Sequence, residues 1–135
     1  MPDTFELEIV TPDRLVVRDI AEEAQIPGKN GYLGILPGHA PLITELAVGE
    51  ITYKSSGSTH YLAVAWGFAE VLPNKVTILA ETAERAREID LKRAQAAKQR
   101  AEQHLGSGDP ETDFERALNA LQRAEARIDV AQKGP

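Results

Sequence analysis

The segment GYLGILPGHAP, residues 31–41, makes stricter demands on the backbone than any other stretch of the chain. Three of its eleven residues are glycine and two are proline, a composition that turns a chain sharply. The tyrosine, leucines and isoleucine between them favour packing against a core, which a flexible linker would not do. The segment therefore predicts a rigid corner of a packed domain, with Tyr32 and His39 as its exposed side chains.

The residues on either side of this corner alternate as strands do. In FELEI, residues 5–9, the apolar residues occupy one face and the two glutamates the other. About nine such short segments lie within the first 80 or so residues, and Gly, Pro, Asn or Ser closes each of them. They cover residues 5–9, 15–17, 23–26, 32–36, 42–44, 49–54, 60–66, 67–71 and 75–80. With no helical period between them, they predict an antiparallel β-sandwich or flattened barrel over residues 1–84.

The composition changes abruptly after Ala80. β-Branched and aromatic residues nearly vanish, and residues 84–105 consist almost wholly of strong helix formers. The GSG segment at 106–108 ends this predicted helix, and Asp109 with Pro110 begins a second one that continues to about Ala131. The connection is so short that the helices must be antiparallel. The predicted fold class is mixed, with the β-sandwich first and a two-helix hairpin over residues 85–135.

The two predicted parts differ in charge and in apolar surface. Residues 1–84 carry 5 basic and 12 acidic side chains, a net charge of −7, whereas residues 85–135 carry 10 and 9, a net charge of +1. The inner face of the first helix offers mostly alanine and charge, and a buried alanine stabilises a fold far less than a buried leucine. We therefore expect marginal docking of the hairpin, which suits either a movable element or an ordinary exposed hairpin.

Composition excludes several classes of site. The chain has no cysteine, which rules out disulfides, thiolate zinc sites and cysteine nucleophiles. Its three histidines, His39, His60 and His104, lack the spacing of metal ligands. The acidic first part argues against nucleic-acid binding. The sequence shows neither a membrane-spanning apolar run nor a signal-peptide pattern, so a cytoplasmic protein is expected.

A strand-rich domain followed by a helical hairpin resembles the epsilon subunit of bacterial F-type ATP synthase. The segments GILPGHAPL at residues 34–42 and LAETA at residues 79–83 agree with this resemblance. The resemblance covers essentially the whole chain. It implies a non-catalytic subunit of the rotary stalk, whose sandwich contacts the gamma subunit and the ring of c subunits and helps couple proton transport to ATP synthesis. It also implies a hairpin that folds beside the sandwich or extends toward the beta subunits and inhibits ATP hydrolysis. Such a subunit is held through the complex, peripherally, at the cytoplasmic face of the plasma membrane or at a thylakoid membrane.

The segment IDLKRA, residues 89–94, matches the Ile-Asp-x-x-Arg-Ala motif by which some bacterial members of this family bind ATP. In those members ATP stabilises the folded-down hairpin, so the resemblance implies ATP as a regulatory ligand and no required cofactor. The implied nucleotide-binding residues are Glu84, Ile89, Asp90, Arg93, Ala94, Arg100, Arg123 and Arg127. The four arginines suit phosphate oxygens, which guanidinium groups bind bidentately. The alternative is a simple intrahelical pair between Asp90 and Arg93.

Two further alternatives stay open at this point. Arg116, Arg123 and Arg127 fall on one side of the second predicted helix, where they meet either an acidic partner segment or only solvent. The chain also fits a free-standing β-sandwich binding module whose hairpin dimerises through its alanine stripes. An independent ATPase is disfavoured, because no residue is evidently placed to activate water.

Overall fold

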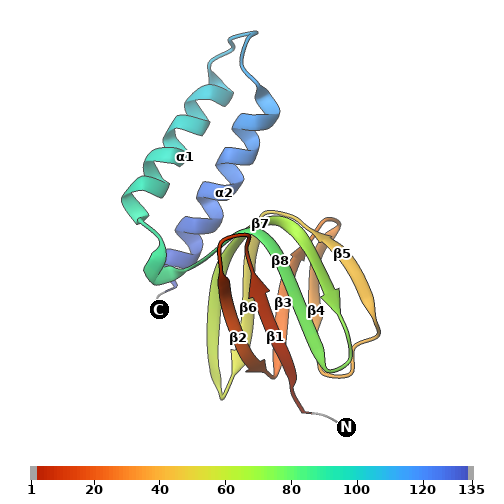
Figure 1. The fold of residues 1–135 in the computed structure, drawn as a ribbon. Helices are drawn as coiled ribbons and strands as arrows, with labels where there is room; N and C mark the ends of the chain where they lie inside the picture. The colour runs from red at the N-terminus through yellow and green to blue at the C-terminus, as the bar shows by residue number, and fades with distance from the viewer. Residues whose placement is uncertain (1–2, 134–135) are drawn as a thin grey trace.

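The chain folds into a two-layered β-sandwich with a helical hairpin at one end (Figure 1). A computed structural model describes residues 3–133. The strands are β1 (Phe5–Val10), β2 (Leu15–Ala21), β3 (Glu23–Gly28), β4 (Gly31–Ile35), β5 (Leu42–Leu46), β6 (Gly49–Ser55), β7 (Ser58–Val71) and β8 (Lys75–Arg85). A 3-10 turn, η1 (Ala86–Glu88), leads to the helices α1 (Leu91–Gly106) and α2 (Phe114–Gln132). This architecture confirms the predicted fold class.

The long strands β7 and β8 belong to both layers of the sandwich. One layer has the order β2-β1-β8-β7-β5, and in the other β7 is followed by β6, β3 and β4. All of these neighbours are antiparallel except β1 and β8, which are parallel. Because β7 and β8 pair with each other from the Leu62–Arg85 pair to the Val71–Val76 pair, one continuous hairpin ties the two layers together.

Alternate residues of the strands fill the space between the layers. Phe5, Leu7 and Ile9, which the sequence places on one face, are all buried there. Each large apolar side chain that is buried in this way stabilises the fold by about 1.5 to 3 kcal/mol. The largest fully buried side chains are those of Tyr53, Phe5, Leu7, Ile9, Ile26, Ile35, Ile51, Leu62 and Ile78. The sandwich is therefore the part of the molecule with a true hydrophobic core.

Residues 3–133 form eight strands where the sequence predicted about nine, because the segments at 60–66 and 67–71 belong to one strand, β7. β7 turns at Trp66 and Gly67, whose φ angles of 50° and 130° lie in the left-handed region. A Cβ atom on Gly67 would lie 1.9 Å from the carbonyl oxygen of Leu79, so only glycine fits. At this turn the alternation of the strand shifts by one residue, so that Leu62 and Val64 face the core before it and Ala69 and Val71 face the core after it. The two halves of β7 can therefore belong to different layers. The glycine that seemed to separate two strands thus bends one.

The helical region begins later than its composition predicts. A helix start at Glu84 was wrong, since β8 continues to Arg85 and Glu84 pairs with Ala63 of β7. α1 begins after Asp90, whose side chain accepts a hydrogen bond from the backbone N–H of Arg93 at 3.1 Å. Pairing with β7 overrides the helix propensity of the residues before η1.

The second helix also begins later than predicted. Asp113, and not Asp109, is its N-cap, and it accepts the backbone N–H of Arg116 at 3.0 Å. Asp109 instead closes a turn by accepting the backbone N–H of Glu111 at 2.9 Å. Both aspartates have the chemistry of an N-cap, so the sequence pattern did not distinguish them.

The hairpin docks on the sandwich through α2. Its two helices pack through Ala94, Ala101, Ala117 and Ala124, all buried. Ala126 and Val130 of α2 then form a small apolar cluster with Ala63 of β7. Val48, Tyr61, Ala86 and Ile89 pack against the rim of this cluster. The apolar contact between the two parts is small, in line with the expected marginal docking.

Candidate nucleotide site and partner-contact surfaces

A cavity of about 340 Å³ lies where the sandwich meets the hairpin. It brings together the end of β8, the link between η1 and α1, the first half of α1 and one residue of α2. Its lining consists of Glu84, Glu88, Ile89, Asp90, Arg93, Ala94, Ala97, Arg100 and Arg127. Seven of the eight residues of the predicted nucleotide site therefore line one cavity, although they come from three separate elements.

Two carboxylates of this cavity are already engaged with arginines. Arg127 donates from Nε to Glu84 Oε1 at 2.7 Å, and both side chains are half-buried. Glu88 pairs with Arg14 of the turn between β1 and β2, and it also accepts the backbone N–H of Arg85 at 3.1 Å. These contacts join η1 and α2 to the sandwich beside the cavity.

Two arginines of the cavity, Arg93 and Arg100, have exposed side chains. Within residues 3–133 neither forms an ion pair, so their guanidinium groups are available to an anionic ligand. The postulated pair of Asp90 with the Arg93 side chain is likewise absent from these residues, since Asp90 caps the helix backbone instead. A site with two free guanidinium groups and small alanine side chains can hold a phosphorylated ligand.

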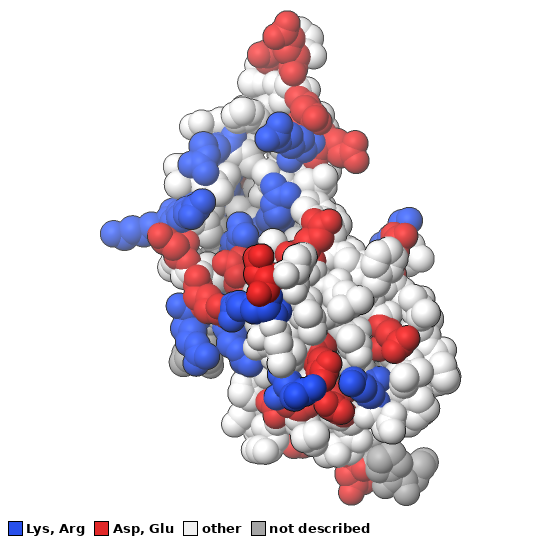
Figure 2. All heavy atoms as spheres, in the orientation of Figure 1, with Lys and Arg blue, Asp and Glu red and all other residues white. Residues whose placement is uncertain are grey.

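Arg123 is the predicted site residue that the structure places elsewhere. Its guanidinium lies over the Trp66 ring of β7, 5.1 Å from the centroid. It lines a neighbouring groove of about 680 Å³ between the two helices, which also includes Arg116 and His104. Arg100 and Arg127 line both hollows, so the groove and the cavity are adjacent. Figure 2 shows several basic side chains, in blue, on the surface of the hairpin.

Tyr32 and His39 occupy different surroundings, although both belong to the corner segment. Tyr32 on β4 is about half exposed, and its hydroxyl accepts the backbone N–H of Glu50 at 3.0 Å. His39 follows β4 in a loop held by the Gly38 N–H, which donates to the Pro73 carbonyl at 2.8 Å. His39 is half-buried, and Nδ1 lies 2.6 Å from the carbonyl oxygen of Ala40. The segment thus contacts the start of β6 and the turn between β7 and β8.

An apolar row crosses the outer face of the sandwich, and sequence reasoning missed it. Strand register aligns Phe68 with Leu79, Leu79 with Val10, and Val10 with Leu15. Phe68, Leu79 and Leu15 are each about half exposed, at 54%, 54% and 48%. Each residue looks ordinary in its own strand, and only the pairing of four strands assembles the row.

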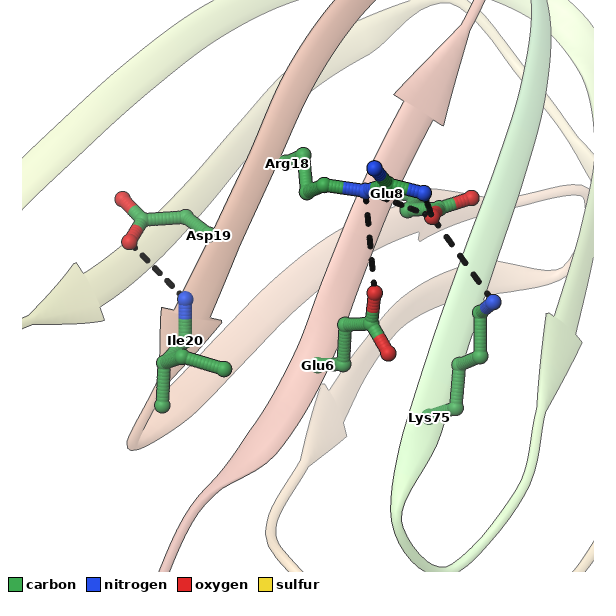
Figure 3. Close-up of polar contacts among 6 residues, drawn as sticks. All are labelled: Glu6, Glu8, Arg18, Asp19, Ile20 and Lys75. Atoms are coloured by element: carbon green, nitrogen blue, oxygen red, sulfur yellow. Dashed lines mark hydrogen bonds and ion pairs between the residues drawn. The ribbon is translucent and has the colours of Figure 1, made fainter.

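A charged cluster of Glu6, Glu8, Arg18 and Lys75 lies on β1, β2 and β8, three of the strands that carry the apolar row, and Figure 3 shows this cluster. Arg18 of β2 donates to Glu8 of β1 at 2.8 Å, and Lys75 of β8 lies 3.7 Å from the same oxygen. The hydrogen bond from Arg18 is the main cause that lowers the pKa of the Glu8 carboxyl. The outer face of β1, β2 and β8 therefore carries a charged cluster as well as the apolar row.

Residues 3–133 offer neither a membrane-spanning helix nor a cluster of metal ligands. No helix among them is long and apolar enough to cross a membrane. These residues also contain no group of three His, Asp or Glu side chains arranged to hold a metal ion.

Both parts of the chain match models of one protein family. The beta-sandwich domain of the ATP synthase delta/epsilon chain matches residues 4–86, and the long alpha-helix domain of that chain matches residues 87–132. The chain is 74% identical over 111 residues to the ATP synthase epsilon chain of Koribacter versatilis, covering 82% of this chain and 78% of that one. It is 50% identical over 130 residues to the epsilon chain of Nitratidesulfovibrio vulgaris (strain DP4), covering 96% and 97% of the two chains.

Two solved structures share the fold. One is a chain from the mitochondrial ATP synthase of Euglena gracilis, with a TM-score of 0.83 and 23% identity over 98% of this chain and 83% of that one. The other comes from the central stalk and c-ring of the Tetrahymena thermophila mitochondrial ATP synthase, with a TM-score of 0.53 and 14% identity over 96% and 94%. At these identities the likeness concerns the fold alone.

Proposed function

The chain belongs to the ATP synthase delta/epsilon chain family, and from this premise we propose that it is the central-stalk subunit that couples proton-driven rotation to ATP synthesis. In the complex it is a non-catalytic subunit. The observation that carries the proposal is the relation to bacterial epsilon chains of nearly equal length, at 50% identity over both the sandwich and the hairpin. We further propose a functional division between residues 1–84, which bind the stalk, and residues 85–135, which regulate it.

The sandwich binds the gamma subunit through its outer apolar row and the ring of c subunits through Tyr32 and His39. The exposed row of Phe68, Leu79, Val10 and Leu15 supports this, because apolar surface of this kind is normally covered by a partner. Phe68→Ser is expected to reduce copurification of the chain with gamma several-fold. Ile20→Ser is the matched control, since Ile20 is 55% exposed but lies outside the row. Equal effects of the two substitutions would exclude the row as the contact.

The hairpin regulates ATP hydrolysis by leaving the sandwich and reaching the beta subunits. Support comes from its small apolar contact with the sandwich and from the basic side chains that it carries. ATP hydrolysis by the reconstituted complex should rise when residues 86–135 are removed. An unchanged rate would exclude the inhibitory role and leave assembly and coupling intact as functions.

ATP is the regulatory ligand of the cavity between the sandwich and the hairpin. Because β8, α1 and α2 all contribute to the lining of this cavity, bound ATP favours the docked hairpin. Titration of the isolated chain with ATP, followed by NMR, should show saturable binding without phosphate release. Arg93→Ala is expected to weaken binding about tenfold or more, since charge-assisted hydrogen bonds contribute roughly 1.5 to 3 kcal/mol. Lys92→Ala is the control, because Lys92 is the adjacent cation but lines a different hollow.

The location follows from the complex. We place the chain at the cytoplasmic face of the plasma membrane, held peripherally by its partner subunits, with a thylakoid membrane as the alternative. A free-standing binding module is the competing function, and it predicts a hairpin-mediated dimer without affinity for gamma. Copurification with gamma from cells distinguishes the two.

A further inference from the structure

The interface between α2 and the sandwich has a small apolar centre. Ala126 and Val130 lie on Ala63 of β7, and both alanines offer only one methyl group. Arg123, Ala126 and Arg127 also line a narrow gap against β7 and β8 of about 10 Å³, too small for a ligand. The helix therefore lies close to the strands, but little apolar area holds it there.

Around this centre the contacts are electrostatic. Arg127 binds Glu84 at 2.7 Å, and Arg123 lies over the Trp66 ring. At the C-terminal end of α2, Lys133 Nζ lies 2.8 Å from both carboxylate oxygens of Glu50. The same ammonium group lies 5.1 Å from the centroid of the Tyr61 ring.

These contacts of α2 and Lys133 all have the same polarity, whereas the pair of Arg14 with Glu88 at η1 has the opposite one. In each contact of α2 and Lys133 the cation belongs to the hairpin side, and the carboxylate or aromatic ring belongs to the sandwich. The hydrogen bond that Lys133 donates to Glu50 is the main cause that raises the pKa of the Lys133 ammonium. Salt screens partly exposed pairs of this kind, since the Debye length falls from about 10 Å at 0.1 M to about 3 Å at 1 M.

The contact between α1 and α2 has a different chemistry. Its buried residues are alanines, and within residues 3–133 no ion pair links the two helices. Salt that screens charges does not weaken apolar packing of this type. Salt should therefore weaken the contact between α2 and the sandwich and leave the contact between α1 and α2 intact.

We propose that the sandwich holds α2 by a one-sided electrostatic clamp, Glu84–Arg127 at one end and Glu50–Lys133 at the other, which opens when salt screens it and releases the hairpin as an intact two-helix unit. The clamp is a property of the isolated chain, so it goes beyond the proposed function and does not depend on ATP. Its hinge is the single connection through Ile89, which has an extended backbone between η1 and α1.

Distance measurement in the isolated full chain tests the clamp. The chain has no cysteine, so Asn30→Cys and Gln99→Cys provide unique spin-label positions on exposed residues of the sandwich and of α1. Between about 0.05 M and 1 M NaCl, where screening becomes strong, the distance distribution should gain a longer component while the helical circular dichroism signal stays constant. A distribution that does not change, or a helical signal lost over the same salt range, would overturn the proposal.

Charge substitutions identify the clamp residues. Lys133→Gln should raise the ratio of open to docked chains at low salt about two- to fivefold, as expected for a partly exposed ion pair. Glu50→Gln should do the same, and the double variant should do no more than either single one. Lys98→Gln removes an equal charge from α1 without touching the sandwich, and it should leave the ratio unchanged. A shift for Lys98→Gln as large as that for Lys133→Gln would mean that net charge, and not the clamp, holds the hairpin.

Discussion

The interior of the sandwich and the interface beneath α2 contain different types of residue. The interior contains Ile26, Ile51 and Ile78, large side chains that solvent does not reach. Beneath α2 the buried residues are mostly alanines, and ion pairs surround them. A single short chain can therefore combine a core with a large buried apolar area and an interface with a small one.

Chain connectivity reinforces this difference. β7 and β8 run through both layers, so the sandwich cannot lose one layer without losing the other. The hairpin, in contrast, joins the sandwich through a single connection after β8. We expect the sandwich to unfold cooperatively and the hairpin to undock without unfolding it.

The turn at Gly67 should give the largest effect on the sandwich. Gly67→Ala places a Cβ atom against the backbone of Leu79 at a φ of 130°, and it should lower the free energy of unfolding by roughly 3 kcal/mol or more. Urea denaturation measures this loss. Gly34→Ala is the control, because a Cβ atom at Gly34 meets nothing within 4 Å. Equal losses for both would show that the bend of β7 does not determine stability.

Overpacking beneath α2 should separate docking from folding. Ala63→Leu inserts a larger side chain under Ala126 and should weaken docking by about 1 to 3 kcal/mol. The midpoint of sandwich unfolding should stay nearly unchanged, because Ala63 points away from the core of the sandwich. NMR shifts of the α2 residues and of the sandwich core report the two events separately. Loss of both together would contradict the division into core and clamp.

The N-cap of α2 should have an intermediate effect confined to the hairpin. Asp113→Ala removes the acceptor of the Arg116 N–H and should destabilise α2 by about 1 kcal/mol. Amide hydrogen exchange in the first turn of α2 should then accelerate. Asp109→Ala should leave that turn protected, since the Asp109 carboxylate accepts the N–H of Glu111 in the turn that precedes α2.

The cluster at Glu8 should give the smallest effect, on the outer face of the sandwich. Because the pKa of Glu8 is lowered in the folded chain, its contribution to stability is present above the unfolded pKa and is lost as pH falls through the folded pKa. Glu8→Gln should remove this part of the acid dependence in unfolding curves. A wild-type and a variant curve of identical shape below pH 4.5, the ordinary pKa of Glu8, would contradict this.

Local sequence patterns predicted most of the sandwich. The alternation at residues 5–9 and the change of composition after Ala80 indicated the order of strands and helices, because each depends on neighbours along the chain. The start of the helical region was missed because Glu84 and Arg85 prefer helix by themselves but pair with β7. The two aspartates before α2 were equivalent as caps, and only the packed hairpin selects Asp113.

The candidate nucleotide site was predicted in part for the same reason. Residues 89–94 form a contiguous motif, and Ile89, Asp90, Arg93 and Ala94 of this motif line one cavity. ATP binding there stays a prediction. Arg123 departs from that cavity because the Trp66 ring, far away in the sequence, attracts its guanidinium.

Sequence patterns alone predicted most of the strands, both helices and the division of charge between the two halves, and they indicated the family to which the chain belongs. Only the tertiary structure decided where β8 ends, how Phe68, Leu79, Val10 and Leu15 form one row, and which cations hold α2 to the sandwich. The physical reason is range. Periodicity and propensity act over a few residues, whereas Glu50 meets Lys133 only after the whole chain has folded.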